Sequence, residues 1–145
     1  MLRTEASVDI DRPAEVILEW ILDLERYRRA DRKITKVVLQ EPGRVRYRGR
    51  LRGIPTPIDE QAVHHEPGRS LVFRGAPRWT RRVVDFEGGF HCTPIPGGTR
   101  VVHRECFGFK PAPVRWIAEA WLEPWLQRDV EAEVGRLKDL VETET

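Results

Sequence analysis

The segment Ala6–Tyr27, with the sequence ASVDIDRPAEVILEWILDLERY, constrains the fold more than any other part of the chain. Val8 and Ile10 alternate with polar neighbours, which is the period of a half-buried strand. Pro13 then begins a helical pattern whose apolar stripe continues to Leu24. A strand that passes at once into a short helix, with no linker between them, restricts the topologies that this chain can adopt.

The rest of the sequence predicts a series of strands followed by one long helix. The first helix is expected to break near Asp23 and to resume to about Arg29, which gives two short helices. The predicted strands are Ile34–Gln40, Val45–Arg52, Ile58–Glu66, Ser70–Gly75, Thr80–Pro94 and Thr99–Phe109. Short Pro-Gly turns between them favour an antiparallel meander, and Gly88-Gly89 indicates a sharp bend in a curved sheet. The final segment, Val114–Val141, has the apolar spacing of a long amphipathic helix.

These elements predict an α+β fold for a single domain, residues 1–145. We expect a curved antiparallel sheet of about seven strands that wraps around the long C-terminal helix and encloses a cavity, with two short helices after the first strand. The longer loops Gly53–Pro57, Gly75–Trp79 and Lys110–Pro113 all fall at one end of such a meander. The mouth of the cavity is therefore expected at that end.

Composition limits the class of protein. A charged fraction of 33% with 40% hydrophobic residues is typical of a globular chain. No apolar run approaches the roughly 18 to 20 residues that span a bilayer, and the N-terminal residues lack the pattern of a signal peptide. Cys92 and Cys106 suggest neither a disulfide framework nor a metal site. We therefore expect a cytoplasmic protein that spans no membrane, binds no DNA and uses no metal or cofactor.

The last two strands carry a polar cluster on an apolar face. A two-residue turn at Gly97-Gly98 would place Cys92 opposite His103 and Phe90 opposite Glu105, whereas a three-residue turn would shift the register and dissolve the cluster. His103 and Glu105, if buried together, are candidate catalytic residues for acid–base chemistry on a carbonyl substrate. They are also compatible with a structural ion pair or with a polar spot that orients a ligand. Cys92 is compatible with a nucleophile or with a small buried hydrophobe.

Aromatic side chains are the main candidates for the wall of the cavity, because the inner face of the sheet and the terminal helix form both core and cavity wall. The predicted ligand-binding residues are Tyr47, Phe86, Phe90, Cys92, Phe107, Trp121 and Trp125.

A row of arginines occupies one face of a predicted strand: Arg46, Arg48, Arg50 and Arg52. These side chains are expected to point to solvent, since an unpaired buried charge is very costly. The row is compatible with a solvated outer face paired to acids such as Asp59, and also with contacts to RNA phosphates. No aromatic residues alternate with these arginines to stack on bases.

The order of elements resembles the START-related helix-grip (SRPBCC) superfamily, which includes polyketide cyclase/dehydrase-like and birch-pollen-allergen-like proteins. Three passages carry the resemblance: VDIDRPAEVILEWILDLERY, PIPGGTRVVHR and DVEAEVGRLKDLVE. The first is similar to the family's opening strand, proline-started helix and Asp-x-x-x-Tyr exit, here Asp23 and Tyr27. The family often has a proline and a tryptophan soon after that tyrosine, where this chain has Arg28 and Ala30.

The resemblance implies binding of a hydrophobic or aromatic small molecule, such as a lipid or a polyketide, between the sheet and the terminal helix. It permits either a simple carrier or a cyclase/dehydratase. The alternative is a macromolecule-binding protein of the ribosome-associated toxin type that acts on RNA through the basic sheet face. The fold alone does not separate these functions.

Overall fold

The computed structural model describes residues 1–145 and has the predicted α+β architecture. The helices are α1 (Ala14–Leu22), α2 (Leu24–Tyr27) and α3 (Ala112–Glu144), with a short 3₁₀ helix, η1 (Trp79–Arg82). The strands are β1 (Leu2–Ile10), β2 (Ile34–Glu41), β3 (Arg44–Leu51), β4 (Ile54–Pro55), β5 (Asp59–Glu66), β6 (Ser70–Gly75), β7 (Val84–Ile95) and β8 (Gly98–Phe109).

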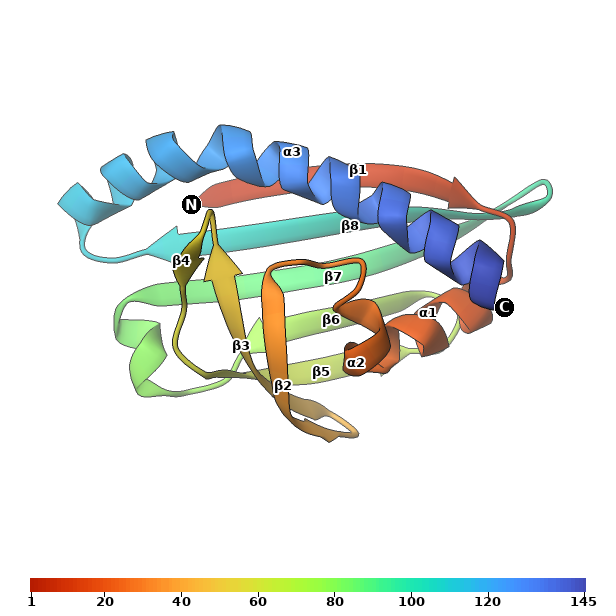
Figure 1. Cartoon of the computed structure of the whole chain (residues 1–145), viewed down its shortest axis with the longest axis horizontal. Helices are drawn as coiled ribbons and strands as arrows, with labels where there is room; N and C mark the ends of the chain where they lie inside the picture. Colours follow the sequence, from red (N-terminus) through yellow and green to blue (C-terminus); the bar gives the residue numbers. More distant parts are fainter.

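The sheet is antiparallel, with the strand order β1-β8-β7-β6-β5-β3-β2, and the two-residue β4 pairs with β3. Strands β2 to β8 therefore form the predicted meander, and β1 closes onto the last strand. Helix α3 crosses the sheet beside β1 and β8, while α1 and α2 lie at its C-terminal end (Figure 1). This arrangement is the helix-grip fold that the element order predicted.

The core lies where the second half of α3 and helix α1 meet the concave face of the sheet. Helix α1 buries Ile17, Leu18, Trp20 and Ile21, because these positions fall on one helical stripe. The buried apolar side chains of α3 are Leu122, Leu126, Val130, Val134, Leu137 and Val141. These residues leave the half of the concave face beside β3, β4 and η1 uncovered by α3, and it is here that a cavity forms.

The pairing of β7 with β8 corrects the predicted register. Ile95 pairs with Gly98, so the turn consists of Pro96 and Gly97 rather than Gly97 and Gly98. Gly97 has φ +84°, a conformation that glycine adopts without steric cost. Moving the turn by one residue shifts the pairing by two, and each side chain keeps its predicted face. His103 therefore lies opposite Phe90, and Cys92 lies opposite Val101.

Two other expectations are wrong in detail. The strand predicted from Thr80 begins only at Val84, because Trp79–Arg82 forms the 3₁₀ turn η1. The apolar stripe predicted at the start of the last helix is not buried: Val114, Ile117 and Trp121 are all exposed. None of the helices has both the length and the hydropathy of a membrane-spanning segment.

Two glycines provide a matched test of this packing. A Cβ atom on Gly98 would lie 2.2 Å from the backbone oxygen of Ile10, whereas a Cβ on Gly135, in α3, would meet no atom within 4 Å. Gly98→Ala should lower the free energy of unfolding by about 1–3 kcal/mol through overpacking. Gly135→Ala should raise it by about 0.5–1 kcal/mol, because alanine loses less backbone entropy in a helix. Urea unfolding of both variants checks the signs, and equal effects would contradict the close approach of the turn to β1.

Candidate functional site

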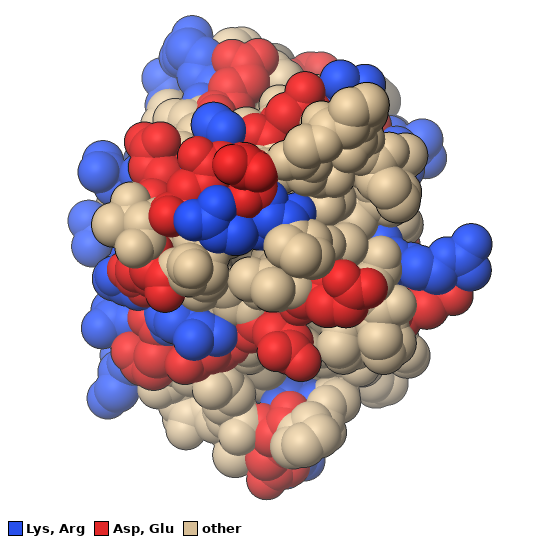
Figure 2. All heavy atoms as spheres, turned by 90° about the vertical axis from the view of Figure 1, so that its right-hand side faces the viewer, with Lys and Arg blue, Asp and Glu red and all other residues tan.

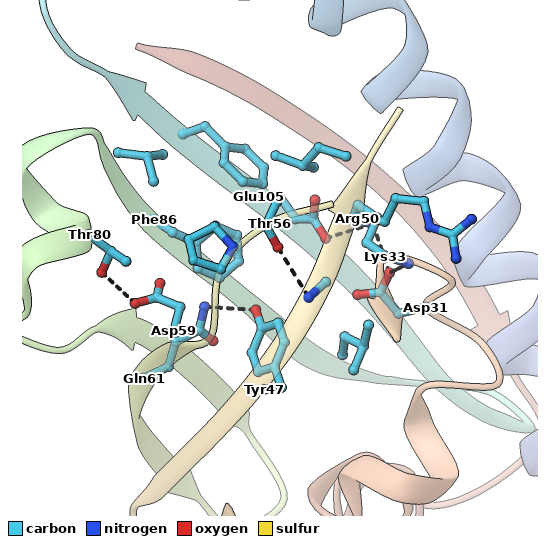
Figure 3. A pocket seen from close by; sticks show the side chains of 16 residues that line it. Asp31, Lys33, Tyr47, Arg50, Thr56, Asp59, Gln61, Thr80, Phe86 and Glu105 are labelled. Carbon is cyan, nitrogen blue, oxygen red and sulfur yellow. Dashed lines mark hydrogen bonds and ion pairs between the residues drawn. The ribbon is translucent and has the colours of Figure 1, made fainter. Parts of the chain in front are cut away.

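A cavity opens between the concave face of the sheet and the segment that precedes β2. It has an empty volume of about 670 Å³, part of which is open to solvent. Its apolar wall consists of Ile34, Leu51, Val84, Phe86 and Phe107. Its polar lining consists of Asp31, Lys33, Tyr47, Thr56, Asp59, Gln61, Thr80 and Glu105 (Figure 3).

The cavity opens at the end of the meander where the long loops were predicted to form its mouth. Arg50 and Pro57 are the exposed residues of its lining. A smaller hollow of about 320 Å³ continues inward, past Phe86 and Tyr47, to Phe90 and His103. Because Tyr47, Phe86 and Glu105 line both spaces, the two adjoin, and we call them the outer and the inner part of the cavity.

Lys33 forms the floor of the cavity, surrounded by four carboxyl groups. Its Nζ lies 3.0 Å from Asp31 Oδ1, 3.3 Å from Glu105 Oε1, 2.5 Å from Asp129 Oδ2 and 2.8 Å from Glu133 Oε1. Burial alone would lower the pKa of this amine, but the four carboxyl groups raise it well above its usual value. Lys33 is therefore a fixed ammonium ion and not a free amine nucleophile.

His103 lies directly behind Glu105 and is also a cation. Its Nδ1 lies 2.9 Å from the carbonyl oxygen of Gly89, and its Nε2 lies 3.2 Å from Glu105 Oε1 and 2.8 Å from Glu133 Oε2. All of these partners accept hydrogen bonds, so both ring nitrogens carry protons. Burial opposes this charge, but the two glutamates raise the pKa of His103 well above its usual value. The ring also stacks on Phe90, with centroids 4.1 Å apart.

Three further groups of the network differ in charge: Glu133 is an anion, Asp31 titrates near neutral pH and Tyr27 is neutral. Burial opposes the ionised form of Glu133, but Lys33 and His103 hold its pKa well below its usual range. Burial, together with the charge of Glu133, raises the pKa of Asp31 to about 7 and also raises the pKa of Tyr27. Tyr27 donates its hydroxyl proton to Glu133, which ties α2 to α3.

A second set of hydrogen bonds organises the wall opposite Lys33. Gln61 Nε2 donates to the hydroxyl oxygen of Tyr47 over 2.8 Å, and burial raises the pKa of Tyr47, which keeps it protonated. Thr80 donates to Asp59 over 2.7 Å (Figure 3). Arg81 pairs with the other oxygen of Asp59. The Tyr47 hydroxyl thus accepts one hydrogen bond and retains its own proton for a further partner.

One buried polar atom of the lining has no hydrogen-bond partner. Oε1 of Glu105 faces both Lys33 and His103, whereas Oε2 is buried and contacts no donor. An unpaired carboxylate oxygen at such a position costs about 1–3 kcal/mol or more unless a donor satisfies it. The side chain lines both the outer and the inner part of the cavity. Glu105 therefore presents a free acceptor at the boundary between them.

The structure brings together most of the residues that the sequence suggested. Tyr47, Phe86, Phe107 and Glu105 line the outer cavity, while Phe90 and His103 line the inner part. Three others lie elsewhere: Cys92, Trp121 and Trp125 are absent from both linings. Burial raises the pKa of the Cys92 thiol to about 11, which is unfavourable for a nucleophile. The paired His103 and Glu105 are buried as expected, but His103 is an imidazolium rather than a free base.

Sequence reasoning missed the charged residues that complete the network: Asp31, Lys33, Asp129 and Glu133. Glu133 had a readable signal, since it falls on the apolar stripe of the terminal helix between Val130 and Leu137. Asp31 and Lys33 had no such sequence signal. They lie in a basic segment, and their burial depends on contacts with residues distant in the sequence.

The acidic groups also form two clusters of metal-ligating type. Ligand atoms of His103, Glu105 and Glu133 lie within 4.8 Å of one another, as do those of Asp31, Asp129 and Glu133. Lys33 Nζ is within 3.0 Å of all three members of the second cluster, and His103 Nε2 donates within the first. The chain's own cations thus occupy the positions that an added cation would need. The absence of a metal remains a prediction from the sequence.

The arginine row differs from the expected paired outer face. Arg46 pairs with Glu60 over 2.7 Å, whereas Asp59 is engaged by Arg81. Arg48 and Arg50 are exposed, as expected. Arg52 leaves the strand and lies over the ring of Trp121, with 4.5 Å between the guanidinium carbon and the ring centroid.

The whole-chain sequence match identifies the family. Residues 1–142 match the model of the family described as polyketide cyclase / dehydrase and lipid transport, and the chain belongs to this family. No curated protein sequence matches the chain.

Solved structures confirm the fold at low sequence identity. A protein of Thermus thermophilus is 18% identical, with 99% of each chain covered and a TM-score of 0.79. The Zhui aromatase/cyclase from Streptomyces sp. R1128 is 18% identical over 97% of this chain and 93% of that one, with a TM-score of 0.77. A START superfamily protein from Mycobacterium smegmatis is 17% identical over the full length of both chains, with a TM-score of 0.73.

The four carboxyl groups around Lys33, which we call the carboxylate cage, predict a large loss of stability when the Lys33 ammonium is removed. Lys33→Met keeps the length of the side chain but leaves four carboxyl groups without their ammonium. We expect the free energy of unfolding at pH 7 to fall by roughly 3–5 kcal/mol, as for other broken buried ion pairs. Urea denaturation measures the loss, and Lys36→Met, at an exposed position of the adjoining strand β2, is the matched control. A loss below about 1 kcal/mol would contradict the cage.

Asp31 predicts a pH dependence of stability with a defined sign. Its pKa in the folded chain is about 7, above the ordinary value of 3.8. At a pH between these two values, Asp31 is therefore protonated in the folded state and ionised in the unfolded state. The contribution of Asp31 to stability is thus complete below about pH 4 and is lost as the pH rises towards 7, by at most about 1.4 kcal/mol per pH unit. Relative to Asp31→Asn, the wild type should lose stability between pH 5 and pH 7 and change little above pH 8.

Urea unfolding of both proteins at several pH values tests this difference. The matched control is Asp139→Asn, whose side chain is exposed on α3. A wild-type-minus-variant difference that stays constant from pH 5 to pH 8 would show that Asp31 does not titrate in this range.

Proposed function

We propose that this protein binds a small hydrophobic or aromatic molecule, of lipid or polyketide type, whose hydroxyl group donates a hydrogen bond to Glu105. The observation that carries the proposal is the free Oε2 atom of Glu105, which is buried on the wall of a cavity that is otherwise largely apolar. Membership of the polyketide cyclase / dehydrase and lipid transport family supports the same class of ligand.

The walls of the cavity support a ligand with apolar or aromatic surface. Phe86 and Phe107, whose ring centroids lie 4.9 Å apart, offer aromatic surface beside Leu51 and Val84. Removing apolar ligand surface from water contributes about 25 cal/mol per Å² to the free energy of binding.

Two polar groups define which ligand fits. Glu105 accepts a hydrogen bond, and the Tyr47 hydroxyl, whose oxygen already accepts from Gln61, has a proton to donate. A ligand with a hydroxyl and a carbonyl on one apolar framework would satisfy both groups. This pattern of alternating oxygens is characteristic of polyketides.

A second candidate function is cyclisation or dehydration of such a ligand. The free oxygen of Glu105 can remove a proton from a carbon beside a carbonyl, while Tyr47 stabilises the developing enolate through its O–H. His103 acts here as the cation that positions Glu105, because both of its ring nitrogens already donate. Binding requires only the cavity, whereas turnover requires both polar groups.

RNA binding through the basic sheet face receives less support. Glu60 neutralises Arg46, and Arg52 turns towards α3, so the predicted row of four cations is reduced to Arg48 and Arg50. The Arg48→Glu/Arg50→Glu variant, tested for salt-sensitive RNA or ribosome association, separates this alternative from ligand binding.

Glu105→Gln tests the ligand-binding proposal directly. The change replaces the free acceptor with an amide that can donate from the same position. Calorimetry should show that the wild type binds 2-naphthol about ten- to a hundredfold more tightly than 2-methoxynaphthalene, which lacks the hydroxyl proton. The variant should lose this preference but still bind both compounds through the apolar walls. Equal affinity of the wild type for the two compounds would contradict the role of Glu105.

Controls separate a local from a global effect. A urea unfolding curve of Glu105→Gln shows whether the cage around Lys33 persists. Leu51→Trp, which fills the outer cavity, should weaken the binding of both compounds equally. Val102→Trp, on the opposite face of the sheet, is the matched control for the added ring.

Native mass spectrometry of freshly purified protein, followed by extraction, identifies a co-purifying ligand. Turnover of a linear polyketide mimic that is lost in Glu105→Gln would support the second function.

A further inference from the structure

The first half of α3 carries an apolar stripe that is largely exposed to solvent. Val114, Ile117 and Trp121 fall three and four residues apart, on one side of the helix, and their exposed fractions are 49%, 74% and 42%. The buried positions of α3 begin only at Leu122. Three large apolar side chains in succession on a solvent-exposed helix face indicate a contact surface.

This stripe lies close to the loops around the mouth of the cavity. Arg52, which follows β3, donates to the backbone oxygen of Trp121 and covers its ring, so the stripe lies beside the β3–β4 turn. Exposed Ile54, Trp79 and Val83 belong to β4 and to the segment around η1. The start of α3, β4 and η1 gather at the left end of the molecule in Figure 1. Thr80, in η1, and Val84 line the cavity itself. We call these exposed apolar side chains, with the arginines between them, the mouth surface.

The charge of the mouth surface has one sign. Arg50, Arg52, Arg78 and Arg82 form no ion pair, and Asp85 is already paired with Lys110 over 3.0 Å. The opposite end of the molecule differs, since acidic and basic side chains alternate there (Figure 2). Arg29 with Glu144 and Lys138 with Glu142 are examples of its pairs. Unpaired basic side chains also occur elsewhere, for example Lys36 and Arg48. The mouth surface is distinguished by the exposed tryptophans Trp79 and Trp121 that accompany its unpaired arginines.

We propose that the mouth surface docks onto an anionic lipid membrane. Tryptophan is enriched at the level of lipid headgroups, where its ring is partly apolar and partly solvated, and aliphatic side chains insert beside it. Basic residues near an anionic bilayer each contribute about 1 kcal/mol. Trp79, Trp121 and Ile117 beside unpaired arginines combine both kinds of attraction on one surface.

The same charges argue against a second copy of this chain as the occupant. A symmetric dimer through the mouth surface would bring the unpaired arginines of the two copies close together. Membrane docking also gives the apolar residues around the mouth a role, because an apolar molecule can then pass from the bilayer into the cavity without crossing water. The proposal concerns the surface alone and does not depend on which molecule the cavity binds.

Vesicle flotation tests the docking. The wild type should bind vesicles of phosphatidylcholine with about 30% phosphatidylglycerol much more strongly than vesicles of phosphatidylcholine alone. Ile117→Ser and Arg78→Glu/Arg82→Glu should each weaken binding to the anionic vesicles by about tenfold or more. The matched controls, Val38→Ser for the apolar change and Arg48→Glu/Arg128→Glu for the charges, lie away from the mouth and should change binding less than twofold.

Other outcomes overturn the proposal. The proposal is wrong if the wild type does not bind anionic vesicles. It is also wrong if the control substitutions weaken binding as much as the substitutions in the mouth surface. A dimer in sedimentation velocity that Ile117→Ser dissociates would assign the surface to a second copy. Binding to polyglutamate without binding to vesicles would assign it to an acidic protein. Quenching of wild-type tryptophan fluorescence by brominated lipid acyl chains provides a readout that needs no variant, and its absence would also count against insertion.

Discussion

The rest of the structure depends on the ion pairs between the buried Lys33 ammonium and the four carboxyl groups around it. The ammonium links the segment before β2 to β8 through Glu105 and to α3 through Asp129 and Glu133. Without it, a carboxylate on the apolar face of α3 would oppose the packing of the helix on the sheet. The helix is thus held by apolar contacts at its C-terminal end and by a buried cation in its middle.

The same cation determines the chemistry of the cavity. Lys33 and His103 both approach Oε1 of Glu105, which orients the carboxylate and leaves Oε2 without a donor. Glu105 thus adds an oriented acceptor beside the Lys33 cation. Under the proposed function, this arrangement would favour ligands that bring a proton donor over ligands that bring an anion, although the surface around the mouth is basic.

The sequence predicted the order of the elements, the curved sheet and the burial of His103 and Glu105, because each of these follows from a local period or from strand parity. It predicted the wrong partners for Cys92 and Phe90, since sequence alone did not locate the turn at Pro96. It also assigned Trp121 to the cavity, because spacing shows which side of a helix is apolar but not whether another element covers it. The cage around Lys33 combines residues almost a hundred positions apart, and no local pattern encodes such contacts.

Helix α3 is continuous over 33 residues, but its two halves differ in what holds them. The half after Leu122 is fixed by the core. The half before it depends on its own backbone hydrogen bonds, on the ion pair between Glu119 and the N-terminal amine, and on contacts near the β3–β4 turn. A short helical segment without tertiary packing is marginal in water. Opening of the first three turns therefore requires much less free energy than global unfolding. The first turns of α3 can therefore open while the carboxylate cage stays intact, so motion at this end of the molecule is separate from the stability of the fold.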